Sequence, residues 1–224
     1  MEFLDLTAYA YSESALPMKA VGWLGSEYGV QGGDATPLTG AELQLLKSAS
    51  LRVRSLMLGV HECEFCWAVE GNGEFRYYLP SGVIHAAPTM IVHYAEEHGY
   101  RPPFELLSGL PEAMRPPWDW RAERLCAVLR DESADFVWRA DAAVDLALWD
   151  DRRAYDALRS VLNDEELVDL AGSEVGRSLA AFSGRAYASD LADGYLHPVV
   201  RSGIEKASQI DYRLCVRPVP PLRR

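Results

Sequence analysis

Four residues in the first half of the chain have the types and spacing of a metal site: Cys63, Cys66, His93 and His98. The two cysteines form a C-x2-C pair. The two histidines follow Cys66 after 26 intervening residues and have four residues between them. A C-x2-C pair followed by H-x3–5-H is the ligand order of structural zinc sites, in which thiolates and imidazoles surround the ion. The spacing therefore predicts a zinc ion held by these four side chains.

The two histidines need a change in helix winding to reach one metal. On an ideal helix His93 and His98 lie about 140° apart, so both reach the same ion only if the last turn tightens or loosens. His61, two residues before Cys63, is a spare candidate that can replace either histidine.

The chemistry of the site depends on whether a coordination position is open. Four protein ligands make a structural zinc, whereas a catalytic zinc keeps a position for water and needs a general base. Glu62, Glu64 and Glu74 are close in sequence, which leaves a zinc-dependent enzyme with a solvent-open site as the alternative. The sequence has no H-x-E motif of zinc deaminases, no G-x-S-x-G and no phosphate-binding glycine loop.

The segments around the cysteines predict strands. Residues 51–60 alternate well enough to form a strand that leads into the cysteine pair, and Gly71–Gly73 is a turn signal. Two further strands, GEFRYYLP and SGVIHAAP, are expected to form a β-hairpin that turns near Pro80–Gly82.

The histidines fall on a predicted helix after this hairpin. Pro88 suits its first turn, TMIVHYAEEH is its body, and Gly99 suits the position just past its end. The chain thus has a knuckle formed by Cys63 and Cys66, then a hairpin, then a helix that carries the histidines. This is the order of elements in a ββα zinc finger. An earlier helix, over about 40–50, is predicted from a capping box that begins at Thr39.

Composition separates the chain into two parts. Residues 1–110 are predicted to form a zinc-stabilised α+β module, and 111–120 a linker rich in proline and tryptophan. Residues 121–224 consist mostly of segments with helical periodicity between short acidic breaks. The predicted fold class is therefore α+β, with a zinc-finger-like hairpin and helix module packed on a C-terminal α-helical domain.

Charge and hydropathy limit the function classes. The net charge of −11 lacks the positive excess that phosphate backbones attract, so no nucleic-acid partner is expected. No apolar run is long enough to span a membrane, and the acidic N-terminus lacks the features of a signal peptide. A cytoplasmic location is expected, with Cys126 and Cys215 as buried free thiols.

The N-terminal part carries several short motifs in one order, among them H-x-C-x-x-C, G-N-G-E and H-Y-x3-H-x-Y-x-P-P. On these motifs, residues 1–110 resemble an uncharacterised family of small bacterial cytoplasmic proteins. The resemblance implies no established activity. His85 stands where that family more usually has an aromatic residue, which argues against His85 as a ligand.

The segment DDRRAYDALRSVLNDEELVDLAGSEVGRSLAAF reads as a helix, a short acidic turn and a second helix. On these residues, 121–182 are weakly similar to HEAT-like helical units of bacterial immunity proteins, which block a secreted toxin's active site. The similarity implies that the C-terminal α-helical domain is HEAT-like. One such unit is not a repeat array, because helical repeats usually need about three units for stability.

The acidic breaks between the helices are the expected partner surface. Asp164, Glu165 and Glu166 would form one face that attracts a cationic partner, for example a basic toxin domain. The leading prediction is a non-enzymatic protein-binding protein, most concretely a toxin-neutralising immunity protein that carries a structural zinc.

Overall fold

The computed structural model describes residues 2–30, 36–191, 196–207 and 216–219, and the side chains of 55–59, 190 and 191 are not described. The chain divides into two compact units. The first contains Met1–Ser12, Pro17–Met114 and Asp211–Arg224, and the second contains Glu13–Leu16 and Arg115–Ile210.

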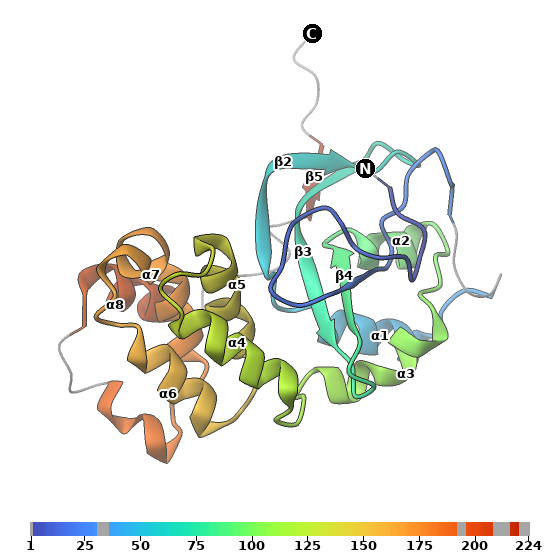
Figure 1. The fold of residues 1–224 in the computed structure, drawn as a ribbon. Coiled ribbons are helices and arrows are strands. Elements are labelled where there is room, and N and C mark those ends of the chain that lie inside the picture. Colours follow the sequence, from blue (N-terminus) through green and yellow to red (C-terminus); the bar gives the residue numbers. More distant parts are fainter. Residues whose placement is uncertain (1, 31–35, 192–195, 208–215, 220–224) are drawn as a thin grey trace, which may run out of the picture. The chain divides into compact units, whose positions relative to one another are not determined.

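The first unit is built on a five-stranded sheet in which β1, β4, β3 and β2 lie in that order and β5 also pairs with β3 (Figure 1). Its strands are β1 (Lys19–Ala20), β2 (Ser55–Glu62), β3 (Val69–Tyr78), β4 (Ile84–Pro88) and β5 (Val216–Pro218). β1 runs parallel to β4, and the other pairs are antiparallel. A register shift between Leu56 and His61 lets β2 bend, so the sheet is curled.

Three helices complete this unit: α1 (Gly40–Ala49), α2 (Ile91–Glu97) and α3 (Phe104–Ala113). The capping box predicted at Thr39 is confirmed, since its side chain accepts from the Glu42 N–H and the Glu42 carboxylate accepts from the Thr39 N–H. The core gathers aromatic residues of β3 with apolar residues of α2, of α3 and of the loop between them: Phe75, Tyr77, Tyr94, Tyr100, Leu106 and Leu110. The mixed α+β class is confirmed.

The hairpin lies where it was predicted, but the expected turn before it does not exist. β3 and β4 are joined by a tight loop in which Gly82 has φ +87°. Gly71–Gly73, predicted as a turn, lies inside β3 and pairs with β2. A Cβ on Gly71 would lie 2.8 Å from Oγ1 of Thr89, so close packing rather than chain reversal requires glycine there.

The structure also moves two predicted boundaries. Pro88 is the last residue of β4 and pairs with Glu74, and α2 begins only at Ile91, so the placement of Pro88 in a helix was wrong. α3 continues through Pro111 to Ala113, which places the start of the expected linker 111–120 inside a helix. Burial of Leu110 and Ala113 holds this last turn in place despite the N–H that proline lacks.

The second unit is helical within its described residues. Its elements are α4 (Trp120–Arg130), α5 (Phe136–Leu146), α6 (Arg152–Ser160), α7 (Glu165–Ala180), the 3₁₀ helix η1 (Ala186–Leu191) and α8 (Pro198–Lys206). α7 and α8 pack backbone to backbone. A Cβ on Gly176 would lie 2.1 Å from the Val200 carbonyl oxygen, and one on Gly203 would lie 2.2 Å from that of Ser173. These glycines are therefore required for close helix contact.

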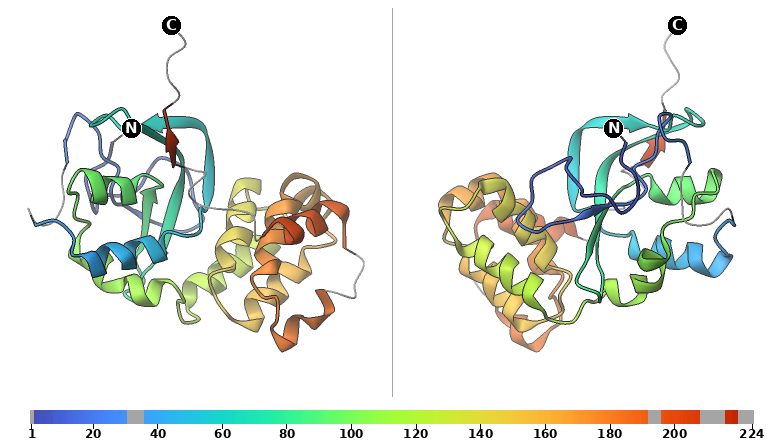
Figure 2. Two further views of the ribbon diagram at one scale, coloured as in Figure 1. Left: turned by 180° about the vertical axis from the view of Figure 1, so that it is seen from behind. Right: turned by 45° about the vertical axis from the view of Figure 1, so that its right-hand side comes forward.

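The C-terminal part of the chain departs from the predicted helical domain of 121–224. Its last described segment, β5, joins the sheet of the first unit (Figure 2). Cys126 is buried and free, as predicted, whereas Cys215 lies outside the described residues.

Candidate metal centre

The cysteine knuckle is the chain reversal between β2 and β3. The Cys63 N–H donates to the Val69 carbonyl at 2.9 Å, and the Trp67 N–H donates to the Cys63 carbonyl at 2.8 Å. These two backbone bonds close the turn and place both thiols on it. Cys63 is completely buried, and Cys66 is exposed.

The end of α2 brings the two histidines together. The helix stops at Glu97, and His98 is its C-cap with φ −118° and ψ 5°. Gly99 follows with φ +68°, the left-handed conformation predicted for the residue past the helix end. Because His98 leaves the helical path, its Nε2 lies 3.1 Å from Nε2 of His93. The predicted change in the last turn is therefore what allows both histidines to face one point.

The four donor atoms form one compact group. The Sγ of Cys63 lies 3.2 Å from Nε2 of His98, and the Sγ of Cys66 lies 3.5 Å from Nε2 of His93. All four donor atoms lie within 4.8 Å of one another. The residues chosen from sequence spacing thus form a group that could hold a metal ion.

Aromatic packing fixes the orientation of this group. The Phe65 ring, from between the two cysteines, lies 5.3 Å from the His98 ring and 5.9 Å from the Tyr94 ring. Tyr94 is fully buried in the core of the unit. The knuckle and the histidine helix are therefore held together by apolar contact as well as by their polar ends.

Burial shifts the ionisation of two of the four residues. It raises the pKa of the Cys63 thiol above its ordinary value. It also lowers the pKa of His93, and the neighbouring His98 lowers it further, which favours the neutral imidazole. Neutral imidazole is the form of histidine that binds metals. The Cys63 thiol, in contrast, would bind a metal cation only as a thiolate, after release of its proton.

His61 and His85 are not part of the group. His61 lies on β2, and its pKa is lowered mainly by burial. His85 is completely buried on β4, and its Nε2 lies 2.9 Å from Oε1 of Glu105 on α3. Among the described residues, the candidate ligand set therefore has four members and leaves out the spare candidate.

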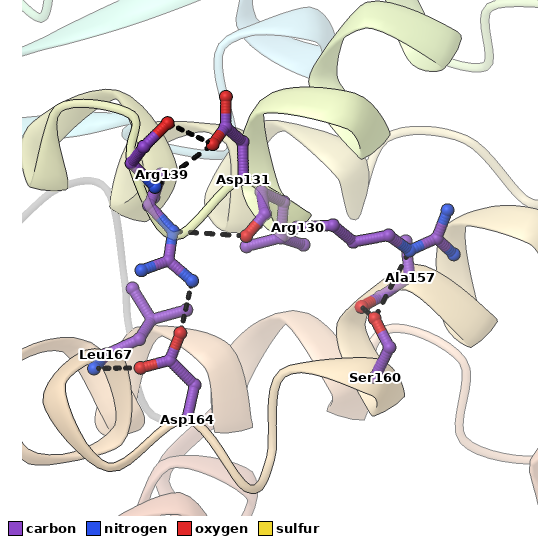
Figure 3. A network of polar contacts seen from close by, with 9 residues as sticks. Arg130, Asp131, Arg139, Ala157, Ser160, Asp164 and Leu167 are labelled. Atoms are coloured by element: carbon purple, nitrogen blue, oxygen red, sulfur yellow. Dashed lines mark hydrogen bonds and ion pairs between the residues drawn. The ribbon is translucent and has the colours of Figure 1, made fainter.

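The acidic run predicted as a partner surface divides into different roles. Asp164 accepts from the Leu167 N–H at 3.0 Å as the N-cap of α7, and it pairs with the guanidinium of Arg139, which is only 2% exposed. Figure 3 shows the Asp164 carboxylate between these two partners. Glu165 and Glu166 are exposed in the first turn of the same helix. Asp164 is therefore engaged within the helical unit, and the exposed acidic groups are the two glutamates.

Sequence reasoning did not foresee two buried carboxylates on β3. Glu74 is fully buried, accepts from the Tyr9 hydroxyl, and pairs with Arg76 at 2.7 Å. Glu70 is 5% exposed and pairs with Arg217 from the C-terminal strand. The carboxylates are separated from Tyr9 and Arg217 by 65 and 147 residues, respectively. Alternation along β3 would instead have predicted these side chains on a solvent-facing side, opposite Phe75 and Tyr77, so no local signal in the sequence indicates their burial.

Residues 1–111 match the model of a family described as a domain of unknown function, DUF7919. The match is consistent with the resemblance of the N-terminal part to an uncharacterised family. No curated protein and no solved structure matches the chain. Within the described part of the chain, no helix has the length and apolar character that crossing a membrane requires.

Proposed function

We propose that Cys63, Cys66, His93 and His98 bind one zinc ion. The observation that carries the proposal is the spacing of their donor atoms. In a tetrahedral site with Zn–S of about 2.3 Å and Zn–N of about 2.1 Å, donor atoms are separated by roughly 3.4–3.8 Å. The neighbouring donors here lie 3.1, 3.2 and 3.5 Å apart, so small side-chain movements would seat the ion. Two thiolates with two imidazoles favour zinc over the hard cations calcium and magnesium.

The zinc is proposed to be structural. Four protein ligands fill a tetrahedral shell and leave no position for a reacting water. Two of the glutamates considered as general bases are engaged elsewhere. Glu74 is fully buried with Arg76, and Glu64 accepts from the Ser26 N–H at 2.8 Å. These contacts favour a structural site over the alternative of a zinc-dependent enzyme.

Metal analysis tests this proposal. Protein purified without added metal is expected to contain one zinc per chain, and Cys63→Ser and His98→Ala are each expected to lower that content. Cys126→Ser, which changes a buried cysteine of the helical unit, is the matched control. Cobalt substitution distinguishes the two kinds of site, because a closed site gives a tetrahedral spectrum that added anions leave unchanged. If the purified protein contained no zinc and its stability were unchanged by a chelator, the proposal would be refuted.

The second proposal is a non-enzymatic, protein-binding role, most concretely neutralisation of a basic toxin domain in the cytoplasm. It is supported by the weak similarity of the helical segment to HEAT-like immunity units and by two exposed carboxylates, Glu165 and Glu166, at the start of α7. An acidic surface raises the association rate with a cationic partner and makes it sensitive to salt.

The binding experiment needs a purified basic toxin domain, which is to be sought among the genes next to the one that encodes this chain. The double variant Glu165→Lys, Glu166→Lys is expected to slow association by about tenfold at low salt, with a smaller effect at high salt. A matched reversal elsewhere on the second unit, at exposed Glu123 and Asp156, is the control. Equal rates for both double variants, or rates indifferent to salt, would exclude this surface.

A further inference from the structure

The last described residues of the chain lie along the beginning of β3, directly after the metal knuckle. The strand pairs are Val69 with Pro218, Glu70 with Arg217 and Gly71 with Val216. Beyond β5, the Val219 N–H donates to the Ala68 carbonyl at 3.0 Å. β2 pairs with the same part of β3 through Glu62 and Glu70. β5 is therefore a short edge strand on residues that already have one strand neighbour.

An ion pair links one residue of this edge strand, Arg217, to Glu70 on β3. The Glu70 side chain is 6% exposed, whereas that of its partner Arg217 is 62% exposed. A carboxylate buried this deeply needs a cation or several donors beside it, because removal from water disfavours its charged form. Arg217 supplies the cation although it lies 147 residues away in the chain. On this edge of β3, the buried Glu70 carboxylate is therefore paired with the arginine of β5.

Trp67 stands at the end of the same edge, just before Ala68. Its backbone has φ +55°, a conformation that favours glycine, and the residue is 62% exposed. A bulky residue in the left-handed region is unfavourable and is typically found where surrounding structure or function requires it. An exposed tryptophan is also the residue type that most often anchors a bound partner.

We propose that the β3 edge from Ala68 to Gly71 is a docking site for an extended segment of a partner protein with the pattern apolar–Arg–Pro–apolar. Val216–Val219 occupies this site in the isolated chain as a tethered ligand. Backbone bonds to β3 supply affinity, Glu70 selects the arginine, and Trp67 contacts the apolar residue that follows. Because a tether gives β5 a high effective concentration, a partner segment binds only by displacing it. This site adjoins the metal knuckle, because the Cys63 N–H donates to the Val69 carbonyl, but it uses none of the four proposed ligand side chains.

The test uses the full-length chain and a labelled peptide with the sequence of residues 216–221, Val-Arg-Pro-Val-Pro-Pro. Arg217→Glu in the chain places two carboxylates together and is expected to release β5. The peptide should then bind this variant at least about tenfold more tightly than it binds the wild-type chain, because the tethered competitor is gone. Adding Glu70→Gln to that variant should weaken peptide binding by about tenfold, since a charged partner of the arginine is lost. The same peptide with glutamate in place of arginine is the control.

Hydrogen exchange on the wild-type chain provides a measurement that does not depend on the variants. Excess peptide should speed exchange in residues 216–219 and leave Val69–Gly71 protected, because one strand replaces another. Equal affinity of the peptide for wild type and variant overturns the proposal, as does no binding to a folded, metal-containing variant. Unchanged exchange in 216–219 also overturns it. A dimer formed by exchange of β5 between two copies would show that the occupant is a second copy and would overturn the assignment to a partner protein.

Discussion

The longest polar contacts span more of the sequence in the first unit than in the second, where those between described residues reach 37 residues. In the first unit, contacts join residues far apart: the pairs Cys63–His98, Glu74–Tyr9 and Glu70–Arg217 span 35, 65 and 147 residues. In the second unit, four consecutive helices begin with an aspartate that accepts from an N–H two or three residues later. These N-caps are Asp119, Asp135, Asp151 and Asp164.

This difference predicts how the stability of each unit should respond to the loss of one side chain. A cluster that joins distant segments stabilises all of them together, so the loss of one member should weaken the whole first unit. An N-cap satisfies donors of one helix start, and its loss should remain local at about 1 kcal/mol. The comparison also explains part of the acidity of the helical half. Aspartates in its inter-helix breaks act as caps, so a cluster of acidic residues in the sequence does not by itself define a binding face.

The largest expected effect separates two buried cysteines. Cys63→Ser removes a proposed zinc ligand and should lower the free energy of unfolding of the first unit by roughly 5 kcal/mol, less than the 10 or more of isolated zinc-finger peptides. Cys126→Ser only places a hydroxyl in the core of the second unit and should lower that unit's stability by about 1–2 kcal/mol. Denaturant unfolding combined with zinc analysis measures both. Similar unfolding of the two variants, with zinc retained, would remove the contrast between the units.

The next effect concerns Asp164, one of the four N-caps above, at which a tertiary ion pair adds to the capping. Asp164 is both the cap of α7 and the partner of buried Arg139, so Asp164→Ala should lower the free energy of unfolding by about 3 kcal/mol. Glu165→Ala, one residue further on an exposed position, should change it by no more than about 0.5 kcal/mol. Thermal and denaturant unfolding of both variants decide. If the glutamate variant were equally damaging, the division of the acidic run into structural and exposed members would be wrong.

A simple cap should give a smaller, local effect. Asp135 accepts from the Val137 N–H at 2.9 Å, and Asp135→Ala should lower stability by about 1 kcal/mol. Asp135→Asn keeps the acceptor and should recover most of that loss. Hydrogen exchange should place the change at the start of α5. A loss of protection spread over all helices of the unit would show that its caps act together and would contradict the comparison.

The smallest effect is a titration in the first unit. The Arg101 guanidinium and the Thr39 cap lower the pKa of Glu42 to about 2. Because the folded-state pKa lies below the unfolded value of 4.5, this contribution to stability is complete above pH 4.5 and declines as the pH falls toward 2. NMR titration of the Glu42 carboxyl measures it. Arg101→Gln should move the pKa up toward 4.5, and an unchanged value would show that the arginine has no role in the shift.

Several features followed from the sequence because their causes are local. The capping box at Thr39, the hairpin turn near Gly82 and the left-handed residue Gly99 each depend on a few neighbouring residues. The candidate ligands also followed from spacing, since a C-x2-C turn and two histidines at one helix end have few geometries that suit a metal. The expected need for the helix to change at His98 came from helical geometry alone.

Tertiary structure decided the features whose causes lie far away in the chain. Gly71–Gly73 has the composition of a turn, but β2 and Thr89 make it part of a strand. The sequence indicates Asp164 as an N-cap of the helix that follows, but its pairing with Arg139, 25 residues earlier, depends on the tertiary structure. The docking of β5 on Glu70 is the extreme case. A buried charge is paired with whichever opposite charge lies beside it in the folded structure. The distance between the two residues in the sequence does not indicate that proximity.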